Sequence, residues 1–279
     1  YIQPGTDERI RLYVLRNRTK RQLEIENEWI YDLRQKSVRF VRGNLKSKIN
    51  KSKIGMVHYR ILFIVNPISG FGLGWEIPYR IRHIAAYKHI EYNIRFTEYA
   101  GHAKEIVEQA KHQNYTHIIA AGGDGTVNEI GTALINTGIA FGVISLGSGN
   151  GFARHLGFSQ MMNKALKQIL KSETTDIDVV EINGHYSLNV SGFGFDAEVA
   201  HFFSRMKIRG IFSYIYSIIH MWFRYPSKRY VFHIDGKTWE EDCFVLSVAN
   251  SSQYGNNASI APKASLRDGL VDVCILKRP

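Results

Sequence analysis

The chain has 279 residues, 44% of them hydrophobic, and a formal net charge of +11, which is ordinary for a packed globular protein of one large or two modest domains. Its two cysteines, Cys243 and Cys274, are too few for a disulfide framework or a cysteine-based metal cluster. The N-terminus lacks the charged-then-apolar order of a signal peptide, and the longest apolar run, residues 211–223, is too short to cross a bilayer, so we expect a cytoplasmic protein without a transmembrane segment.

The N-terminal part of the chain holds most of the positive charge. Residues 1–60 contain fifteen Lys and Arg against six Asp and Glu, a balance of +9. Apolar residues at helical spacing predict an amphipathic helix around residues 22–40, and residues 43–55 have the composition of a linker. A basic segment of this kind can bind an anionic membrane surface or an acidic partner, or can simply be solvated. It carries no base-reading motif, so we expect no nucleic-acid partner.

Residues 57–172 alternate short apolar strands with helical stretches. We predict strands at residues 61–66, 93–97, 117–121 and 141–146, and helices at 75–89, 103–112 and from 127 onward. This alternation indicates a parallel sheet covered by helices on both faces. Ligands of such sheets bind beyond the carboxyl ends of the strands, where this chain has three glycine-rich loops, residues 67–74, 122–125 and 147–151.

Residues 173–279 have the pattern of an antiparallel β domain. β-forming residues cluster or alternate at 177–182, 185–190, 229–234, 244–249 and 270–276, with turn residues between them. One helical stretch, residues 197–225, interrupts these strands and contains the aromatic run 211–223. This run is either a buried core helix or a helix that contacts lipid, and its basic flanks would suit anionic headgroups.

The second glycine-rich loop has the most specific chemical pattern, because residues 122–129 read GGDGTVNE. Glycines directly after a buried strand let the backbone approach a phosphate, and the following helix offers its positive N-terminus to the same anion. Asp124 in this loop could hold magnesium or accept the proton of an attacking hydroxyl. Thr126 and Glu129 have an alternative explanation, because T-x-x-E is also the spacing of a helix capping box.

The other two loops also carry polar side chains at the ends of their strands. The first reads NPISGFG from Asn66, and the third reads LGSGNGFAR from Leu146. Either loop alone is a common turn. Three such loops at strand ends of one sheet are less easily explained by chance, and they predict a shared nucleotide site.

These segments resemble, in order and spacing, the motifs of the diacylglycerol kinase catalytic-domain family, which also includes sphingosine kinases, ceramide kinases and bacterial lipid kinases. The family motifs are an Asn-Pro-x-Ser-Gly turn, GGDGTxNE, a Gly-Ser/Thr-x-Asn loop ending in Ala-Arg, a Gly-Phe-x-x-Asp stretch, and a late Pro-x-Ala followed by Asp-Gly. The chain carries them at residues 66–70, 122–129, 147–154, 192–196 and 261–269. GGDGT alone is less specific, since NAD kinases and phosphofructokinases resemble it.

The resemblance implies a lipid kinase that uses ATP and Mg²⁺ to phosphorylate the hydroxyl of a lipid, such as diacylglycerol or a sphingoid base, in the cytoplasm or peripherally at the membrane surface. It implies Asp124 as the catalytic residue, Asp196 as the group that recognises the lipid headgroup, and Asp268 as a ligand of structural magnesium. The nucleotide-binding residues that it implies are Asn66, Ser69, Gly70, Gly122, Gly123, Gly125, Thr126, Glu129, Gly147, Ser148, Asn150, Arg205 and Arg209.

The chain also departs from the family pattern. Ser145 stands where Pro is usual and Gly151 where many members have Asp, a form closer to sphingosine kinases, so the sequence does not single out one lipid. The family continues beyond a strand such as residues 270–276 with further strands, one of which carries an Asp-Gly-Glu motif. The resemblance therefore implies a sandwich domain that lacks its last part.

Together these features predict an α/β fold of three parts. A basic helical N-terminal extension, residues 1–56, precedes a parallel-sheet nucleotide-binding domain, residues 57–172, and a partial antiparallel β-sandwich domain that binds lipid, residues 173–279. The alternative functions are a small-molecule kinase of the NAD kinase type and a non-catalytic nucleotide- or lipid-binding module. The sequence does not indicate the oligomeric state.

Overall fold

The computed structural model of the chain describes residues 9–15, 23–26, 37–41, 59–70, 72–88, 90–182, 184–206, 211–234 and 237–278. The chain folds as two compact units. Unit 1 comprises residues 1–36, 178–253 and 258–279, and unit 2 comprises residues 37–177 and 254–257.

Unit 2 contains a parallel sheet. Its strands are β3 (Ser37–Val41), β4 (Arg60–Val65), β5 (Glu91–Phe96), β6 (His117–Gly122) and β7 (Ala140–Ser145), in the spatial order β3-β7-β6-β4-β5. The inner strands β4, β6 and β7 are almost fully buried, because helices cover both faces of the sheet, and they therefore read as continuous apolar runs. The predicted parallel α/β architecture is confirmed.

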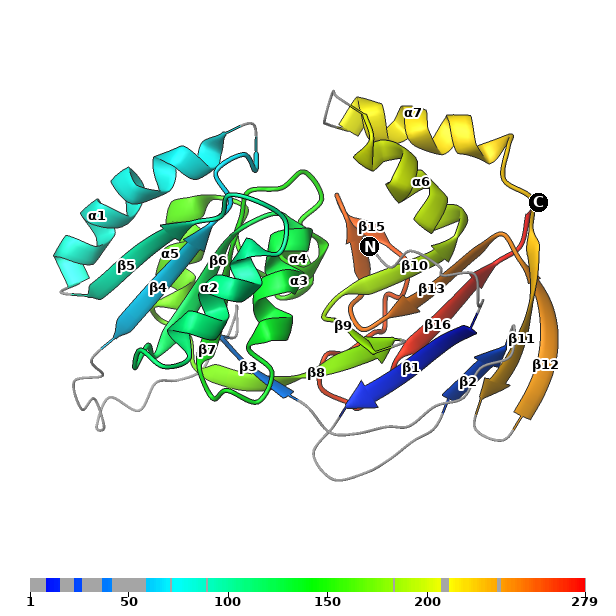
Figure 1. Cartoon of the computed structure of the whole chain (residues 1–279), viewed down its shortest axis with the longest axis horizontal. Helices are drawn as coiled ribbons and strands as arrows, with labels where there is room; N and C mark the ends of the chain where they lie inside the picture. The colour runs from blue at the N-terminus through cyan, green and yellow to red at the C-terminus, as the bar shows by residue number, and fades with distance from the viewer. Residues whose placement is uncertain are drawn as a thin grey trace. The chain divides into compact units, whose positions relative to one another are not determined.

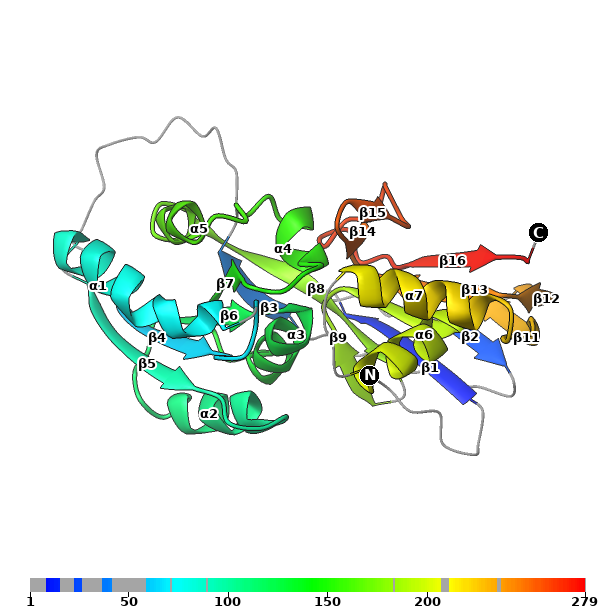
Figure 2. The same cartoon turned by 90° about the horizontal axis from the view of Figure 1, so that it is seen from above.

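Helices follow the strands of unit 2 in turn. They are α1 (Ile77–Lys88), preceded by the short 3₁₀ helix η1 (Leu73–Glu76), α2 (His102–Ala110), α3 (Asp124–Ala133), α4 (Gly151–His155) and α5 (Met162–Ile169). Figure 2 shows α2 and α3 on one face of the sheet and α1 and α5 on the other. Each predicted strand and helix of this region is present close to its predicted position, whereas α4 and α5 were not predicted.

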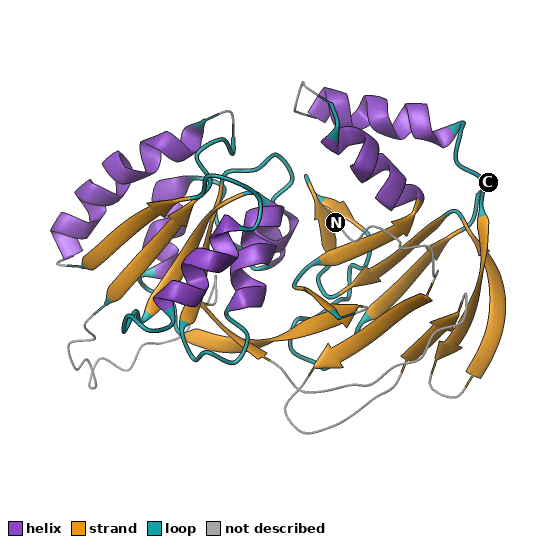
Figure 3. Cartoon of the chain, in the orientation of Figure 1, coloured by secondary structure: helices purple, strands orange, loops and turns teal. Residues whose placement is uncertain are grey.

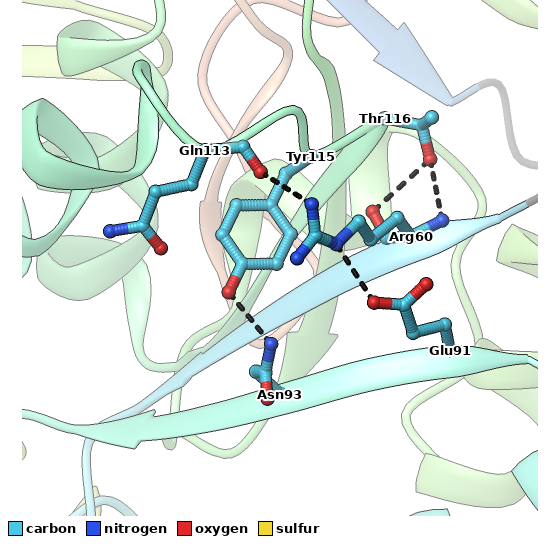
Figure 4. Close-up of polar contacts among 6 residues, drawn as sticks. All are labelled: Arg60, Glu91, Asn93, Gln113, Tyr115 and Thr116. Carbon is cyan, nitrogen blue, oxygen red and sulfur yellow. Dashed lines mark hydrogen bonds and ion pairs between the residues drawn. The ribbon is translucent and has the colours of Figure 1, made fainter.

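Polar contacts join neighbouring strands at the amino-terminal edge of this sheet (Figure 4). Arg60, the first residue of β4, forms an ion pair with Glu91 of β5 at 2.9 Å and donates a hydrogen bond to the carbonyl of Gln113 at 3.1 Å. Thr116, just before β6, accepts the amide of Arg60 and donates to its carbonyl. These contacts hold the starts of β4, β5 and β6 in register, so the loops at the opposite, carboxyl ends of the strands have defined positions.

Unit 1 contains two antiparallel sheets, which confirms the predicted antiparallel β-sandwich fold. The first sheet has the order β12-β11-β2-β1-β8, with β9 paired to β8, and the second has the order β10-β13-β16. The strands are β1 (Arg9–Leu15), β2 (Leu23–Glu26), β8 (Thr174–Ile182), β9 (His185–Ser187), β10 (Val190–Gly194), β11 (Lys228–Ile234), β12 (Lys237–Cys243), β13 (Val245–Ala249) and β16 (Asp272–Leu276). A short hairpin, β14 (Gln253–Gly255) and β15 (Ala258–Ser259), lies between β13 and β16 in sequence.

Strand β13 shows how unit 1 forms two cores. Leu246 and Val248 pack with Phe232 of β11 between the two sheets, while Val245 packs with Val199 on the opposite face. This alternation is expected because successive side chains of a strand point to opposite faces. The second face is covered by α6 (Phe195–Ser204) and α7 (Ile211–Trp222), as Figure 3 shows. The single helical stretch predicted at residues 197–225 is therefore two helices.

The predicted N-terminal helix over residues 22–40 is wrong. The described residues of this range form β2 and β3, and β1 precedes them (Figure 1, dark blue). Strand β1 pairs with β2 and β8, β2 also pairs with β11, and β3 pairs in parallel with β7. These backbone pairings to strands far along the chain outweigh a local helical pattern. The predicted linker, residues 43–55, lies outside the described residues.

Candidate functional site

The first glycine-rich loop is attached to the second by the side chain of Asn66. Its Nδ2 donates to Thr126 Oγ1 at 3.2 Å, and its Oδ1 accepts the amide of Ile68 at 3.2 Å, which forms a local turn. Gly70 has a left-handed backbone (φ +62°) and lies so close to the carbonyl of Leu146 that a Cβ would collide with it. A glycine is therefore required where the first loop meets the third. The amide of Ser69 donates to the Asn66 carbonyl in the same turn.

The first glycine of the second loop, Gly122, packs closely against the side chain of Thr126. A Cβ on Gly122 would lie 2.6 Å from the Cβ of the buried Thr126. Helix α3 begins at Asp124 with Gly123 as its N-cap, so Thr126 lies inside the first turn and the alternative capping-box explanation is wrong. The sequence pattern predicted too late a start for α3, because the loop before this helix is shorter than expected.

Glu129 is directed toward another helix. Its Oε1 accepts the amide of Lys104, in the first turn of α2, at 3.2 Å. An acidic side chain is favourable at this position because it interacts with the positive end of the helix and gives a second acceptor to an amide that also donates to the Gly101 carbonyl. Glu129 thus stabilises the packing of α2 against α3. Its implied contact with nucleotide stays a prediction.

The third loop follows β7 and enters the short helix α4. Asn150 has a left-handed backbone (φ +53°) and is only 7% exposed; its Nδ2 donates to the Gly147 carbonyl at 2.7 Å and to Gln160 Oε1 at 2.8 Å. Its Oδ1 is buried and has no hydrogen-bond partner among the residues that the structure describes. Ser148 is exposed at the tip of the loop. A buried acceptor without a partner is costly, so this loop is suited to receive a donor from a ligand.

Asp124 joins the second loop to the third. Its Oδ2 accepts the amide of Gly151 and its Oδ1 the amide of Phe152, each at 3.3 Å, at the start of α4. Burial raises the pKa of the Asp124 carboxyl, and hydrogen bonds from the amides of Phe152, Gly151 and Asn150 lower it only in part. A carboxylate with a raised pKa is a better proton acceptor than an exposed one, and each of its oxygens retains a lone pair for a ligand.

The structure therefore brings together, within unit 2, the predicted residues of all three loops. The remaining predicted residues lie elsewhere in the chain. Asp196 is in the first turn of α6 and accepts a hydrogen bond from Ser247 Oγ at 3.2 Å, and Arg205 is exposed at the end of α6. Arg209 lies outside the described residues. The roles implied for these three side chains stay predictions.

Asp124 is better suited than Asp268 to hold a magnesium ion. Among the residues with described placement, no three His, Cys, Asp or Glu side chains are grouped so that they could hold a metal ion. Asp268 Oδ1 accepts the amide of Leu270 at 3.0 Å, and its role as a metal ligand stays a prediction. Mg²⁺ that arrives with nucleotide phosphates needs only one or two carboxylates, which Asp124 can supply.

Two contacts to the third loop were not anticipated. Arg154 donates to the Gly149 carbonyl, and so does the amide of Asn256, about a hundred positions later in the chain. Arg154 belongs to the third motif but has no local feature that reveals its partner. The residues 255–257, read as Gly-Asn-Asn, signal a tight turn, yet nothing in the sequence indicates where that turn docks.

Gly123 allows a test of phosphate contact that does not disturb the fold. Its backbone is extended (φ −86°), which any residue can adopt, and an added Cβ would meet only Gly147 Cα at an ordinary 3.5 Å. Gly123→Ala should therefore fold normally, whereas its methyl group would obstruct a phosphate lying against the loop. We expect ATP affinity, measured by calorimetry, to fall at least about tenfold, equivalent to about 1.4 kcal/mol.

Gly147→Ala is the matched comparison, because its Cβ would lie 2.8 Å from Gly123 Cα and should disturb folding as well as binding. Unchanged ATP affinity in a folded Gly123→Ala variant would show that the second loop is only a turn.

Comparisons with known proteins agree on one family. The family model described as "Diacylglycerol kinase catalytic domain" matches residues 60–182, and the model described as "YegS C-terminal NAD kinase beta sandwich-like domain" matches residues 189–279. A "Diacylglycerol kinase" of Bacillus subtilis is 30% identical over 224 residues, which cover 78% of this chain and 74% of the relative. A Pectobacterium atrosepticum protein named "Probable lipid kinase YegS-like" is 32% identical over 66% of this chain and 64% of its own length. The match thus spans less than two thirds of that relative.

A solved structure has the same fold. The crystal structure of a diacylglycerol kinase from Bacillus anthracis superimposes with a TM-score of 0.62 at 26% sequence identity, covering 79% of this chain and 74% of that protein.

Proposed function

The chain belongs to the diacylglycerol kinase catalytic-domain family, and from this premise we propose that it transfers the terminal phosphate of ATP to a hydroxyl group of a lipid. The observation that carries the proposal is the position of Asp124, a half-buried carboxyl with a raised pKa at the junction of the second and third glycine-rich loops. A proton acceptor beside a phosphate-binding loop is the arrangement that phosphoryl transfer to a hydroxyl requires.

In this proposal, different residues of unit 2 have different roles. The backbone of Gly123 and the N-terminus of α3 face the phosphates, because Gly123 leaves its surroundings open and the helix carries a partial positive charge there. Asn66, Ser69, Ser148 and Asn150 supply polar groups for the nucleotide. Mg²⁺ bound with ATP would neutralise phosphate charge. Asp124 receives the proton of the lipid hydroxyl as that oxygen attacks.

The roles of three further side chains, one for the lipid and two for nucleotide phosphate, are proposed from the family resemblance. Asp196 would hydrogen-bond the hydroxyl-bearing headgroup, and Arg205 and Arg209 would contact phosphate. Asp196 lies next to the backbone of Gly192, where a Cβ would come within 2.5 Å of the Asp196 Cβ, so its side chain has a restricted position. A restricted acceptor is suited to select one headgroup geometry.

Helix α7 supports contact with a lipid surface, because it exposes apolar side chains and buries polar ones. Ser217 is completely buried and donates to the carbonyl of Ser213 at 2.8 Å. Ile215, Ile219 and Phe223, spaced four residues apart on one face, are 45%, 55% and 77% exposed. Another face of α7 packs against the core through Ile218, Met221 and Trp222, so the run is a core helix on that face, and lipid contact is our proposal for the exposed one.

This exposed face has basic neighbours. Arg224 and Lys228, just after α7, are both exposed. An apolar face with adjacent positive charge is typical of helices that lie at the interface of an anionic membrane. Among the described helices, none is long and apolar enough to cross a bilayer. We therefore propose peripheral binding at the membrane surface, and the cytoplasmic location stays a prediction.

Ile219→Ser combined with Phe223→Ser tests this face. Removing two side chains that enter the interface should weaken binding to vesicles containing anionic phospholipid at least about tenfold, because each apolar side chain contributes on the order of 1 kcal/mol. Vesicle cosedimentation measures the effect. Met161→Ser, at an exposed apolar residue of unit 2, is the matched control. Equal binding by the double variant and the control would exclude α7 from the lipid contact.

The proposed activity is tested directly with radiolabelled ATP. The chain is incubated with Mg²⁺ and, separately, with diacylglycerol, a sphingoid base, a mixed lipid extract and NAD. Label transferred to a lipid fraction supports the proposal and identifies the lipid class. Label on NAD would support the small-molecule kinase alternative, and ATP binding without transfer to any acceptor would support the non-catalytic module.

A further inference from the structure

A short turn from late in the sequence packs against the third glycine-rich loop of unit 2. Asn256 and Asn257, at the tip of the β14–β15 hairpin, both have left-handed backbones, with φ of +50° and +63°. The amide of Asn256 donates to the Gly149 carbonyl at 3.0 Å, and Asn150 and Gly255 form an isolated antiparallel bridge. Gly255 must be glycine, because a Cβ would lie 2.6 Å from Gly149 Cα.

Arg154 of α4 binds both the loop and the turn. Its Nε donates to the Gly149 carbonyl at 3.1 Å, and its Nη1 donates to Asn257 Oδ1 at 3.1 Å. The planar guanidinium holds the two acceptors in a fixed relation, which a flexible ammonium group would do less well. The Gly149 carbonyl thus receives two donors, one from Arg154 and one from Asn256.

The orientation of this carbonyl sets the direction of the next amide. In a trans peptide the C=O of Gly149 and the N–H of Asn150 point in opposite directions. The carbonyl accepts hydrogen bonds from Arg154 and Asn256, and the amides of the next residues after Asn150, Gly151 and Phe152, donate to the Asp124 carboxyl at 3.3 Å each. The backbone of the third loop therefore connects Arg154 on one side with the Asp124 carboxyl on the other.

We propose that Arg154 and the turn Gly255–Asn257 are positioning elements that fix the Gly149–Asn150 peptide, and through it the carboxyl of Asp124 and the third loop, in the geometry used for phosphoryl transfer. The inference rests on the proposed function for its consequence in catalysis, but the positioning itself can be measured without activity. Neither Arg154 nor the turn needs to touch substrate.

The first measurement is the NMR chemical shift of the backbone amides of Gly151 and Phe152. Both amides donate to Asp124, so their shifts report the geometry of this contact without any catalytic activity. Arg154→Ala should change both shifts, because the Gly149 carbonyl then loses one of its two donors.

Asn257→Gly distinguishes a positioning effect of Arg154 from the effect of losing the arginine's charge. It removes the acceptor of Arg154 Nη1 and leaves the charge and the left-handed backbone in place. It should move the amide shifts of Gly151 and Phe152 in the same direction as Arg154→Ala. Asn256→Gly is the matched control, because it keeps the backbone amide that donates to Gly149 and should change neither.

The second measurement is the rate of phosphoryl transfer, with Arg95→Ala, at an exposed arginine of β5, as a control for general effects in unit 2. Arg154→Ala and Asn257→Gly should lower kcat about tenfold and change the KM for lipid less than about twofold, since the loss is in alignment at Asp124. NMR changes without any transfer in the wild type would refute the proposed function and retain the positioning role. Unchanged amide shifts of Gly151 and Phe152 in both variants would overturn the positioning role itself.

Discussion

Replacing Asp124 with asparagine is expected to lower phosphoryl transfer at least about a hundredfold, because the loss of a positioned proton acceptor commonly has an effect of this size. The asparagine fits the same space and retains one oxygen that can accept the amide of Phe152 or Gly151. It cannot take up the proton of an attacking hydroxyl. Steady-state transfer of labelled phosphate to lipid measures the change.

The same substitution should leave the fold intact and change how the stability of the folded chain depends on pH. Burial raises the pKa of Asp124, so the folded chain holds this proton more tightly than the unfolded chain does. The stability that results is present at low pH and is lost as the pH rises through the raised pKa. The asparagine side chain does not titrate and has no such loss, so Asp124→Asn should gain in thermal midpoint relative to wild type between acidic and neutral pH.

Asp124→Ala completes the test, because it removes both acceptors of the α4 amides and should disturb the third loop. Wild-type turnover in a folded Asp124→Asn protein would contradict the assignment of Asp124 as the catalytic residue.

The α/β half of the fold could be predicted from sequence because its signals are local. Strands such as Ile61–Val65 are continuous apolar runs, and each is followed by a helical stretch of sufficient length. The carboxyl-end rule then places three loops at one edge of the sheet. The loops do meet there, through Asn66 with Thr126, Gly70 with Leu146, and Asp124 with Gly151.

Side-chain partners within the site could not be predicted in the same way. Glu129 accepts an amide of α2, which only the packing of α2 on α3 brings near it. The capping-box explanation of Thr126 depended on a helix start three residues later than the observed one. The contact of Arg154 with Asn257 joins positions separated by about a hundred residues, and sequence spacing carries no information on such a pair.

The prediction of a helix over residues 22–40 was wrong for a related reason. Residues 22–40 show apolar spacing that suits a helix. The strand state of β2 is stabilised by hydrogen bonds to β1 and β11 on its two sides. Such pairing depends on the sheet already present, so a short segment can adopt a structure that its own pattern does not favour.

Deleting residues 1–36 is therefore expected to remove most of the stability of unit 1. Strands β1 and β2 lie in the middle of the order β12-β11-β2-β1-β8, so the deletion leaves β8 and β11 each with an unpaired edge. The β11–β12 hairpin would lose its only other sheet partner in the described part of unit 1, and an isolated hairpin is marginal in water. Phe232 of β11 would also lose its alignment with Val180 and Ile182 of β8 in the core.

We expect the truncated chain to lose a cooperative thermal transition for unit 1, or to unfold at least about 10 °C lower, as followed by calorimetry. The rival hypothesis treats the N-terminal segment as a basic arm that binds membranes. It is tested separately by replacing Lys46, Lys48, Lys51 and Lys53, which lie outside the described residues, with glutamine. Binding to anionic vesicles should then weaken and lose part of its salt dependence, without a change in thermal midpoint.

The two sets of variants distinguish a structural role from an electrostatic one. Loss of stability only on deletion supports a structural role for β1 and β2, because pairing in the middle of a sheet cannot be replaced by solvent. Loss of vesicle binding only in the lysine variant supports the basic arm as an additional membrane contact. A protein without residues 1–36 that keeps the full-length thermal midpoint would contradict the central position of these strands in the sheet.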